Sequence, residues 1–498
     1  MSSEKKVYKA VATVTAYSIF TKFISLFFKI YISRELGAET MGLYQISTSV
    51  FYLFASLTAS GLPLVISRKV AEKEVLKDSK GYQDLLTGAL ILGITVSLAM
   101  IGLLYVFRNH LGSLFSDKRS LPLFLIIMPA LLSTTIYYII RSFFWGKKEY
   151  SRFAFTEMLE ELMRIVICLL LISGVFFTIS GAKAITYAFI ISDILICIVL
   201  IFMFFSYGGK LSSTPKFKEI GRPALPITIM RIFSSLSITF VALLFPLRLM
   251  QSGLTMSEAT ASYGRVSGMA NPLILAPMSI LGSLSVVLVP EMSEKCARKD
   301  YSALNRQINS GLEFSFLVSG IFLLCYLALG EEITTLLYKD AQSGRYLQWA
   351  CFIMIPLSLS QLTQSAMNSM GLEKKSFFNY IIGTLAMFAC VYFLPPYIGI
   401  YSVALASFSS LTISGMLNLV MLKKFTGLKL EFIRSFLSAM LFALVSAYFA
   451  YSVYGIVAKA LGVFGLVLSA GAGMGMYVAL SLVTDTVKLN TFKIKGAR

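Results

Sequence analysis

Two long apolar stretches joined by a short polar turn fill residues 222–294. A helix rises 1.5 Å per residue, so about 20 residues cross the roughly 30 Å of hydrocarbon in a bilayer, and each stretch is longer than that. The pattern indicates a membrane-spanning helical hairpin. Yet Arg231 lies well inside the first stretch and Arg265 opens the second, and a charge at the bilayer centre costs roughly 2.5–3.5 kcal/mol on insertion scales. The hairpin is therefore predicted to face something polar.

The whole chain continues this pattern. Of its 498 residues 57% are hydrophobic and only 14% are charged, whereas soluble domains carry about 25% charged residues. We predict an all-α integral membrane protein with fourteen transmembrane helices, at about residues 8–33, 42–67, 85–107, 120–143, 153–178, 184–206, 223–250, 263–289, 307–329, 346–369, 377–396, 399–422, 432–454 and 461–484.

The formal net charge of +19 has a membrane explanation. When the loops are assigned to alternating sides, about 30 of the 44 Lys and Arg residues fall on the side of the N-terminus and about 10 on the other. This bias predicts a multi-pass protein of the cytoplasmic membrane with both termini in the cytoplasm. Because the excess charge belongs to short inner loops, a nucleic-acid partner is disfavoured.

Signals for enzymatic chemistry are sparse. His110 is the only histidine, in a predicted outer loop, and no metal-binding, nucleotide-binding or nucleophilic motif is present. The six cysteines follow no disulfide or zinc spacing. We therefore expect a monomeric non-enzyme without cofactor or metal. Without an ATP site, uphill transport must draw on an ion gradient or the membrane potential.

A weak internal repeat runs through the chain. Glu39 precedes Tyr44 by five residues after helix 1, as Glu258 precedes Tyr263 after helix 7. A second pair of similar segments, 146–153 and 371–378, follows helices 4 and 10. The offsets of 219 and 225 residues indicate a six-helix unit present twice in the same orientation.

The repeat predicts two pseudo-symmetric six-helix lobes around a central cavity. The predicted divisions are an N-lobe over residues 1–222, a C-lobe over residues 223–422, and two extra helices with a cytoplasmic tail over residues 423–498. Lobes related by an axis along the membrane normal can open the cavity to either side.

Helix 1 carries one polar face. Thr15, Ser18, Lys22, Ser25 and Lys29 follow one another at spacings of 3, 4, 3 and 4, which places them on one side of an α-helix. Hydroxyl groups with two ammonium groups are typical of the wall of a wet cavity that receives an anion. The alternative for Lys29 is that it lies near the outer end and extends to the lipid headgroups.

Helices 7 and 8 add two cations. Arg231 lies close to Ser234 and Ser235, which gives a second polar patch deep in an apolar span. Pairing with a buried carboxylate is the structural alternative for Arg231, and anchoring at the outer surface is the alternative for Arg265.

Buried acids supply the opposite charge. Glu160 and Arg164 are four residues apart in helix 5, a spacing that favours a structural ion pair. Asp193 in helix 6 and Glu313 in helix 9 lie within apolar spans, and an intramembrane carboxylate is a candidate for coupling to H⁺ or Na⁺. Asp193 could equally hold a polar contact between helices.

Four segments together resemble the multidrug/oligosaccharidyl-lipid/polysaccharide flippase superfamily, and most closely its stage V sporulation protein B branch. They are SRELGAETMGLYQ, RSFFWGKKEYSRFAFTEMLEELMR, SGLTMSEATASYGRVSGMANPLILAP and VLVPEMSE, in this order. The superfamily also contains lipid II flippases and the multidrug antiporters called MATE transporters. The resemblance implies fourteen helices, alternating access, and movement of a lipid-linked sugar, as in polysaccharide, peptidoglycan or spore-envelope assembly.

The resemblance also suggests roles for single residues. In the related lipid II flippases, cations in helices 1, 2 and 8 line the cavity, and Lys22 and Arg265 match the positions in helices 1 and 8. A second cationic position of helix 1 falls at Phe28, next to Lys29, and helix 2 carries no deep basic residue, which disfavours lipid II itself. The resemblance implies a lipid-tail groove at the two extra helices, residues 432–484.

We therefore expect a flippase whose substrate is a sugar linked to polyprenyl pyrophosphate. Lys and Arg bind phosphate through charge and hydrogen bonds. Three alternatives remain: an ion-coupled multidrug antiporter, which an acid-lined cavity would favour; a membrane-embedded transferase acting on the same lipids; and a scaffold for envelope assembly.

Overall fold

The computed structural model describes all residues except 1–2, 60, 174–178, 180, 430 and 485–498; the side chains of residues 3–15, 79, 218, 279–280, 283–287 and 459 also lie outside the described part. The described residues form helices and no strands, as predicted. They divide into two compact units, Met1–Met250 with Leu254–Gly264, and Gln251–Gly253 with Arg265–Arg498.

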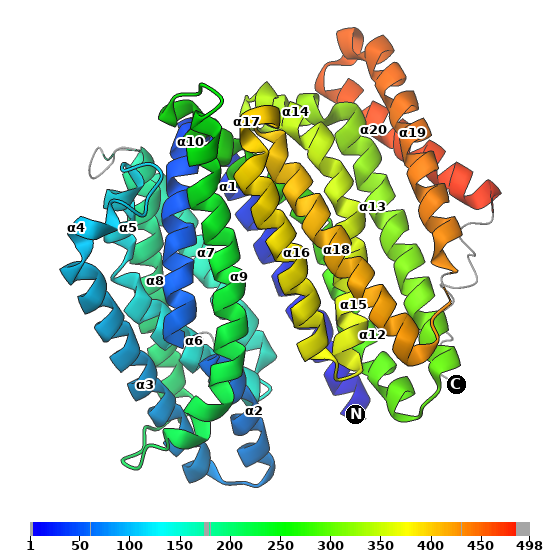
Figure 1. The fold of residues 1–498 in the computed structure, drawn as a ribbon. Coiled ribbons are helices and arrows are strands. Elements are labelled where there is room, and N and C mark those ends of the chain that lie inside the picture. Colours follow the sequence, from blue (N-terminus) through cyan, green and yellow to red (C-terminus); the bar gives the residue numbers. More distant parts are fainter. Residues whose placement is uncertain (1–2, 60, 174–178, 180, 430, 485–498) are drawn as a thin grey trace. The chain divides into compact units, whose positions relative to one another are not determined.

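The first unit contains ten helices among its described residues (Figure 1). They are α1 Ser3–Ala59, α2 Leu62–Val75, α3 Ser79–Val106, α4 Arg108–Leu111, α5 Ser120–Ile127, α6 Ala130–Gly146, α7 Tyr150–Ile172, α8 Gly181–Ser206, α9 Lys218–Met250 and α10 Met256–Gly264.

The second unit continues from α10 with a π-helical segment, Arg265–Ala270. Its α-helices are α11 Asn271–Leu275, α12 Met278–Ala297, α13 Tyr301–Tyr338, α14 Ala341–Ala350, α15 Met354–Ser369, α16 Glu373–Phe393, α17 Pro395–Ile398, α18 Tyr401–Thr426, α19 Phe432–Leu461 and α20 Val463–Val483. A short 3₁₀ turn, Cys351–Ile353, joins α14 to α15.

Within the described residues, nine helical segments are long and apolar enough to cross a membrane, or ten with the bent pair α5–α6. One of the nine is the 60-residue segment Ala16–Val75. Sixty helical residues would extend about 90 Å, three times the thickness of the hydrocarbon. The helical geometry breaks at Gly37, whose φ is 78°, and Figure 1 draws the two halves of α1 as separate helices. The protein is thus a multi-pass membrane protein, and the number of fourteen spans stays a prediction.

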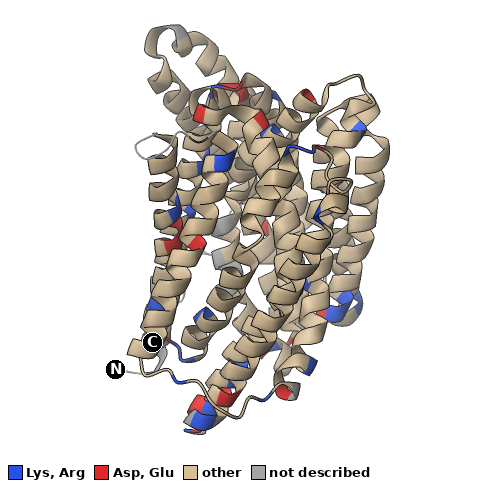
Figure 2. Cartoon of the chain, turned by 90° about the vertical axis from the view of Figure 1, so that its left-hand side faces the viewer, with Lys and Arg blue, Asp and Glu red and all other residues tan. Residues whose placement is uncertain are grey.

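The placement of charged residues fits helices that span a membrane. In Figure 2 most Lys, Arg, Asp and Glu gather near the helix ends, with few along the helices between. The core of the first unit is apolar, and Leu85, Phe143, Phe144 and Phe204 are buried in it from α3, α6 and α8. An ionised side chain within these helices therefore needs a nearby polar partner.

Helix α9 packs within the first unit, against α1 and the start of α2. The Thr239 hydroxyl of α9 donates a hydrogen bond of 2.8 Å to the backbone carbonyl of Ser49. A Cβ atom at Gly61 would lie only 2.3 Å from the carbonyl oxygen of Ala224. By compactness α9 thus groups with α1–α8, whereas the lobe boundaries at residues 222 and 422 remain predictions.

The second half of α1 and helix α10 touch backbone to backbone. A Cβ atom at Gly42 would lie 2.1 Å from the Thr260 carbonyl oxygen, and one at Gly264 would lie 1.9 Å from the Ala38 carbonyl oxygen. These two helices begin with the two segments that the predicted repeat matched, around Glu39 and Glu258.

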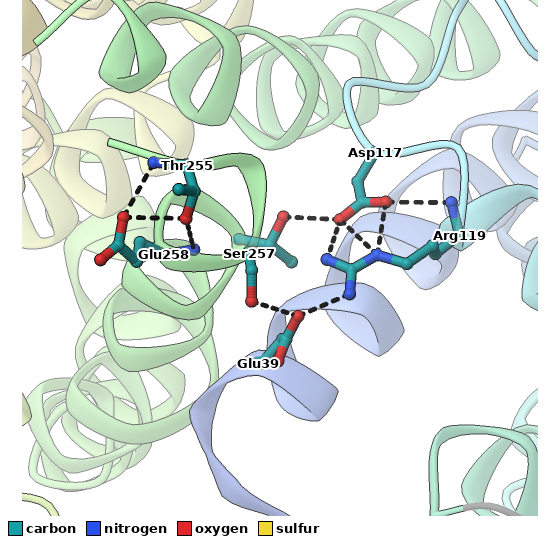
Figure 3. Close-up of polar contacts among 7 residues, drawn as sticks. Glu39, Asp117, Arg119, Thr255, Ser257 and Glu258 are labelled. Carbon is teal, nitrogen blue, oxygen red and sulfur yellow. Dashed lines mark hydrogen bonds and ion pairs between the residues drawn. The ribbon is translucent and has the colours of Figure 1, made fainter. Parts of the chain in front are cut away.

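A polar network joins the same two helices (Figure 3). Arg119, just before α5, donates to Asp117 through Nη2 at 2.7 Å and to Glu39 of α1 through Nη1 at 2.6 Å. Ser257 of α10 donates to Glu39 at 2.5 Å, and Thr260 donates to Asp117 at 2.9 Å. Three separate segments of the first unit are therefore held by two carboxylates.

Helix α10 is also capped at its start (Figure 3). The carboxylate of Glu258 accepts from the Thr255 backbone at 2.8 Å, and the Thr255 hydroxyl accepts from the Glu258 backbone at 3.3 Å. This reciprocal pair is a capping box, which satisfies two otherwise unpaired amides.

We predict that Gly264→Ala destabilises the protein by about 1–3 kcal/mol, because the new methyl group overlaps a backbone oxygen and forces α1 and α10 apart. The matched control is Gly475→Ala on α20, where the methyl group would meet no atom within 4 Å. Thermal unfolding in detergent measures both. Equal melting temperatures for the two variants would contradict the close packing.

We also predict a pH-dependent contribution from Asp117. Burial acts to raise the pKa of this carboxyl group, but hydrogen bonds from Arg119 and Thr260 outweigh it and hold the pKa below its usual value. A carboxyl group whose pKa is lower in the folded than in the unfolded state stabilises the fold at pH values above its unfolded-state pKa of about 3.9. This stabilisation disappears as the pH falls through the folded-state pKa. The difference in melting temperature between wild type and Asp117→Asn should therefore be largest near pH 7 and shrink below about pH 4. A difference that grows on acidification would refute this assignment.

Candidate functional site

A charged cavity of about 230 Å³ lies within the first unit, between α1, α6 and α7. Its lining is polar on every side: Thr21, Lys22, Ser25, Tyr138, Arg141, Glu157, Glu160 and Glu161. We call it the α1–α6–α7 pocket. Lys22 and Ser25, which the spacing in helix 1 placed on one face, do lie together here.

Helical periodicity explains how each helix presents its residues. Tyr138 and Arg141 are three residues apart on α6, and Glu157 and Glu161 are four apart on α7. Residues at these spacings share one face of a helix. Each helix therefore turns two or three polar side chains toward the same space.

Arg141 and Glu157 connect the two helices of the α6–α7 hairpin. Arg141 Nη2 donates to the Glu157 carboxylate at 2.6 Å, and Arg141 Nε donates to the Phe153 carbonyl at 3.2 Å. The guanidinium carbon also lies 3.7 Å from the centre of the Phe153 ring. The side chain of Arg141 is 11% exposed, so this cation is fixed by both an ion pair and an aromatic face.

Arg164 forms ion pairs with the other two glutamates. Its Nη2 donates to Glu160 at 2.5 Å and its Nη1 to Glu161 at 2.8 Å. Ser25 of α1 donates to the second oxygen of Glu161 at 2.6 Å. The pair that the i, i+4 spacing predicted is thus present as part of a larger cluster that also reaches α1.

Three polar groups of the pocket, one of them the Tyr138 hydroxyl, have no hydrogen-bond partner among the described residues. Lys22 is exposed and makes no ion pair or hydrogen bond with them. The Thr21 hydroxyl is buried, with the residue 8% exposed, and no described atom pairs with it. Buried polar groups are normally satisfied, so an unpaired one that lines a cavity indicates space for water or a ligand.

Asp193 lies outside the lining, on α8. Its carboxylate accepts hydrogen bonds from Ser133 and, at 3.1 Å, from Thr134, both on α6. The residue is 3% exposed. This is the polar contact between helices that the sequence left open, and a coupling role for Asp193 stays a prediction.

The remaining predicted residues are more scattered. Ser18 and Lys29 are partly buried on α1. On α9 Arg231 is exposed, while Ser234 and Ser235 are partly buried, and the Ser234 hydroxyl bonds within its own helix, to the Met230 carbonyl at 3.3 Å. Thr15 lies outside the residues whose side chains are described.

In the second unit Arg265 is paired. Its Nε donates to both oxygens of Asp340, at 2.9 and 3.2 Å, and both side chains are mostly buried. A carboxylate thus balances its charge in this conformation, unlike that of Lys22. Glu313 is partly buried on α13. The roles of both residues stay predictions.

Sequence reasoning did not single out Arg141, Tyr138 or Thr21. A signal for Arg141 was available in the hairpin, since Arg141 and Glu157 each lie eight residues from Glu149 in the turn. Residues equally far from a tight turn face each other in antiparallel helices. Tyr138 and Thr21 give no such signal, because their place depends on how α1 packs against α6.

Two family models match the chain. The model for polysaccharide biosynthesis proteins matches residues 7–295, and the MatE model matches residues 232–393. Among curated proteins, stage V sporulation protein B of Bacillus subtilis is 24% identical over 84% of this chain and 83% of its own length. The lipid II flippase MurJ of the same organism is 19% identical over 76% of each chain.

Solved structures show the same fold. A lipid II flippase MurJ in an inward closed conformation superposes with a TM-score of 0.76 and 16% identity, over 95% of this chain and 98% of the other. An inward-facing multidrug resistance MATE family transporter of the MOP superfamily superposes with a TM-score of 0.67 and 12% identity, over 82% and 94%. With the family model covering more than half of its residues, the chain belongs to the polysaccharide biosynthesis protein family, within the superfamily of MOP flippases and transporters.

Proposed function

We propose that this protein is an alternating-access flippase that moves a polyprenyl-pyrophosphate-linked sugar or peptidoglycan precursor across the cytoplasmic membrane. The observation that carries the proposal is the ammonium group of Lys22. It lies on a mostly apolar helix, lines a polar pocket and has no partner among the described residues. The tail of such a lipid can remain in hydrocarbon, whereas the phosphates and sugars cannot. A wet, charged pocket replaces the water that they lose.

Lys22 suits phosphate because both neighbouring arginines are already occupied. Arg141 and Arg164 are bound to glutamates, at 2.6 Å and 2.5 Å. An incoming anion therefore meets Lys22 as the cation whose hydrogen bonds are available. Lys29, Arg231 and Arg265 are further phosphate-binding residues in this proposal, with Arg265 first released from Asp340.

Transport against a gradient requires coupling. In this proposal Asp193 and Glu313 are the sites that exchange H⁺ or Na⁺, since each is a carboxylate within a membrane-spanning helix. Both termini are placed in the cytoplasm, in accordance with the charge bias of the loops. Among the relatives, the lipid II flippase MurJ supports a lipid-linked substrate, and stage V sporulation protein B supports a role in spore formation.

The second candidate function is that of an antiporter for organic cations. It is favoured by the three glutamates of the α1–α6–α7 pocket and by the match to the MatE model. Against it, Arg141 and Arg164 offset two of the three glutamate charges, and Lys22 supplies a third positive charge that repels a cation. An ion-driven dye-uptake assay in liposomes distinguishes the two functions. A flippase should not raise the uptake of a fluorescent organic cation above the rate seen in protein-free liposomes, whereas an antiporter should.

We predict that Lys22→Gln lowers the rate of flipping by about tenfold or more, since a hydrogen bond to a charged group contributes about 1.5–3 kcal/mol. Lys22→Arg retains the charge and should keep most of the activity. The measurement uses proteoliposomes with a lipid-linked oligosaccharide that an external glycosyltransferase can reach only after crossing.

Lys148→Gln is the matched control for this test, because Lys148 is an exposed lysine in the α6–α7 turn outside the pocket. It should flip at the wild-type rate. Wild-type flipping by Lys22→Gln would exclude Lys22 as the phosphate site, and conversion of the lipid to a new chemical species would indicate an enzyme instead.

A further inference from the structure

We infer that the α1–α6–α7 pocket binds the sugar ring next to the pyrophosphate, while Lys22 binds the phosphate. The inference rests on the proposed function and makes it narrower: the substrate must carry a neutral, hydroxyl-rich ring directly beside its phosphates. Recognition would then depend on hydrogen bonds from the pocket walls, in addition to charge.

The first argument is the charge balance of the pocket. Three glutamates line it, and Arg141 and Arg164 form ion pairs with them. Lys22 forms no ion pair with a described residue, but its charge brings the formal sum of these six groups to zero. A cluster without net charge disfavours both a bare cation and a second phosphate inside. In the described part of the chain, no group of acidic, His or Cys side chains has the arrangement of a metal site. A neutral polar group fits this environment best.

The second argument is the supply of unused hydrogen-bonding atoms. The ion pair with Arg141 uses Oε2 of Glu157, so Oε1 remains available as an acceptor, and the side chain is 45% exposed. The Thr21 hydroxyl has no described partner although the residue is more than nine-tenths buried. The Tyr138 hydroxyl of α6 is a third unused group, with no described hydrogen bond. Sugar hydroxyls, which both donate and accept, complement this mixture of groups.

The third argument is size. A volume of about 230 Å³ corresponds to roughly seven or eight water molecules at about 30 Å³ each. This space suits one sugar ring and is too small for a longer oligosaccharide. Additional sugars would have to extend outside the pocket, so the pocket can bind only the ring nearest the phosphate.

Two variants remove hydroxyl groups without breaking any described bond. Thr21→Val and Tyr138→Phe keep the shape of each side chain, and neither hydroxyl has a described partner. The double variant should therefore fold like the wild type, which its melting temperature checks. Ser452→Ala on α19 is the matched control, because it removes an exposed hydroxyl remote in sequence that bonds only to its own helix.

The test compares two probes on the purified full-length protein: farnesyl diphosphate, and farnesyl diphosphate carrying one N-acetylglucosamine. We expect the wild type and Ser452→Ala to bind the sugar conjugate about tenfold more tightly than the bare diphosphate. In the Thr21→Val, Tyr138→Phe variant this ratio should fall to about two or less, with binding of the bare diphosphate unchanged. Lys22→Gln should weaken both probes by the same factor.

The outcomes separate the inference from the proposed function. If the double variant keeps the wild-type ratio of affinities, the pocket does not bind the sugar, and the inference is wrong while the flippase proposal stands. If the wild type binds neither probe, the proposed function itself fails and the inference with it.

Discussion

An ionised side chain within hydrocarbon is costly unless an opposite charge or water accompanies it, and this constraint organises the first unit. Arg141 and Arg164 lie on helices packed into an apolar bundle, and each is bound to a glutamate. Removing one partner from a buried pair typically costs 3–5 kcal/mol, because the other charge is left uncompensated. The α6–α7 hairpin thus holds two arginines and three glutamates as ion pairs, and Lys22 of α1 supplies the third positive charge of the cluster.

These ion pairs leave Lys22 as the available cation of the α1–α6–α7 pocket. With the arginines bound to glutamates, the pocket presents one available ammonium group and several oxygen atoms instead of a cluster of free cations. A cluster of free cations would attract any anion. In the proposed function, a pocket whose charges are balanced and which has one available cation selects a ligand with a charged group next to neutral polar groups. The positions of the hydrogen-bonding groups then determine the specificity.

The sequence predicted the helical membrane fold, the family and the face of helix 1, because each depends on local periodicity or on segments that can be recognised in order. It also predicted the pairing of Glu160 with Arg164, since four residues along a helix bring them together. The partners of Arg265 and Asp117 were out of reach, because Asp340 is 75 residues from Arg265 and Thr260 is 143 residues from Asp117. Contacts of that separation depend on how whole helices pack, which periodicity does not determine. The Thr21 hydroxyl was missed for the same reason.

A lysine as the unpaired cation of the α1–α6–α7 pocket is consistent with the proposed transport. Arginine binds phosphate through a rigid pair of hydrogen bonds, whereas lysine acts as a compact, strongly hydrated point charge on a flexible stem. A carrier must release its substrate on the far side of the membrane. A site that binds the substrate too tightly would slow the transport cycle, because the two conformations of a carrier can differ in free energy by only a few kcal/mol. A single flexible ammonium group, with hydroxyl and carboxylate oxygens beside it, provides many weak contacts that can be broken one after another. In the proposed cycle, by contrast, the paired arginines would maintain the shape of the pocket while the substrate enters and leaves.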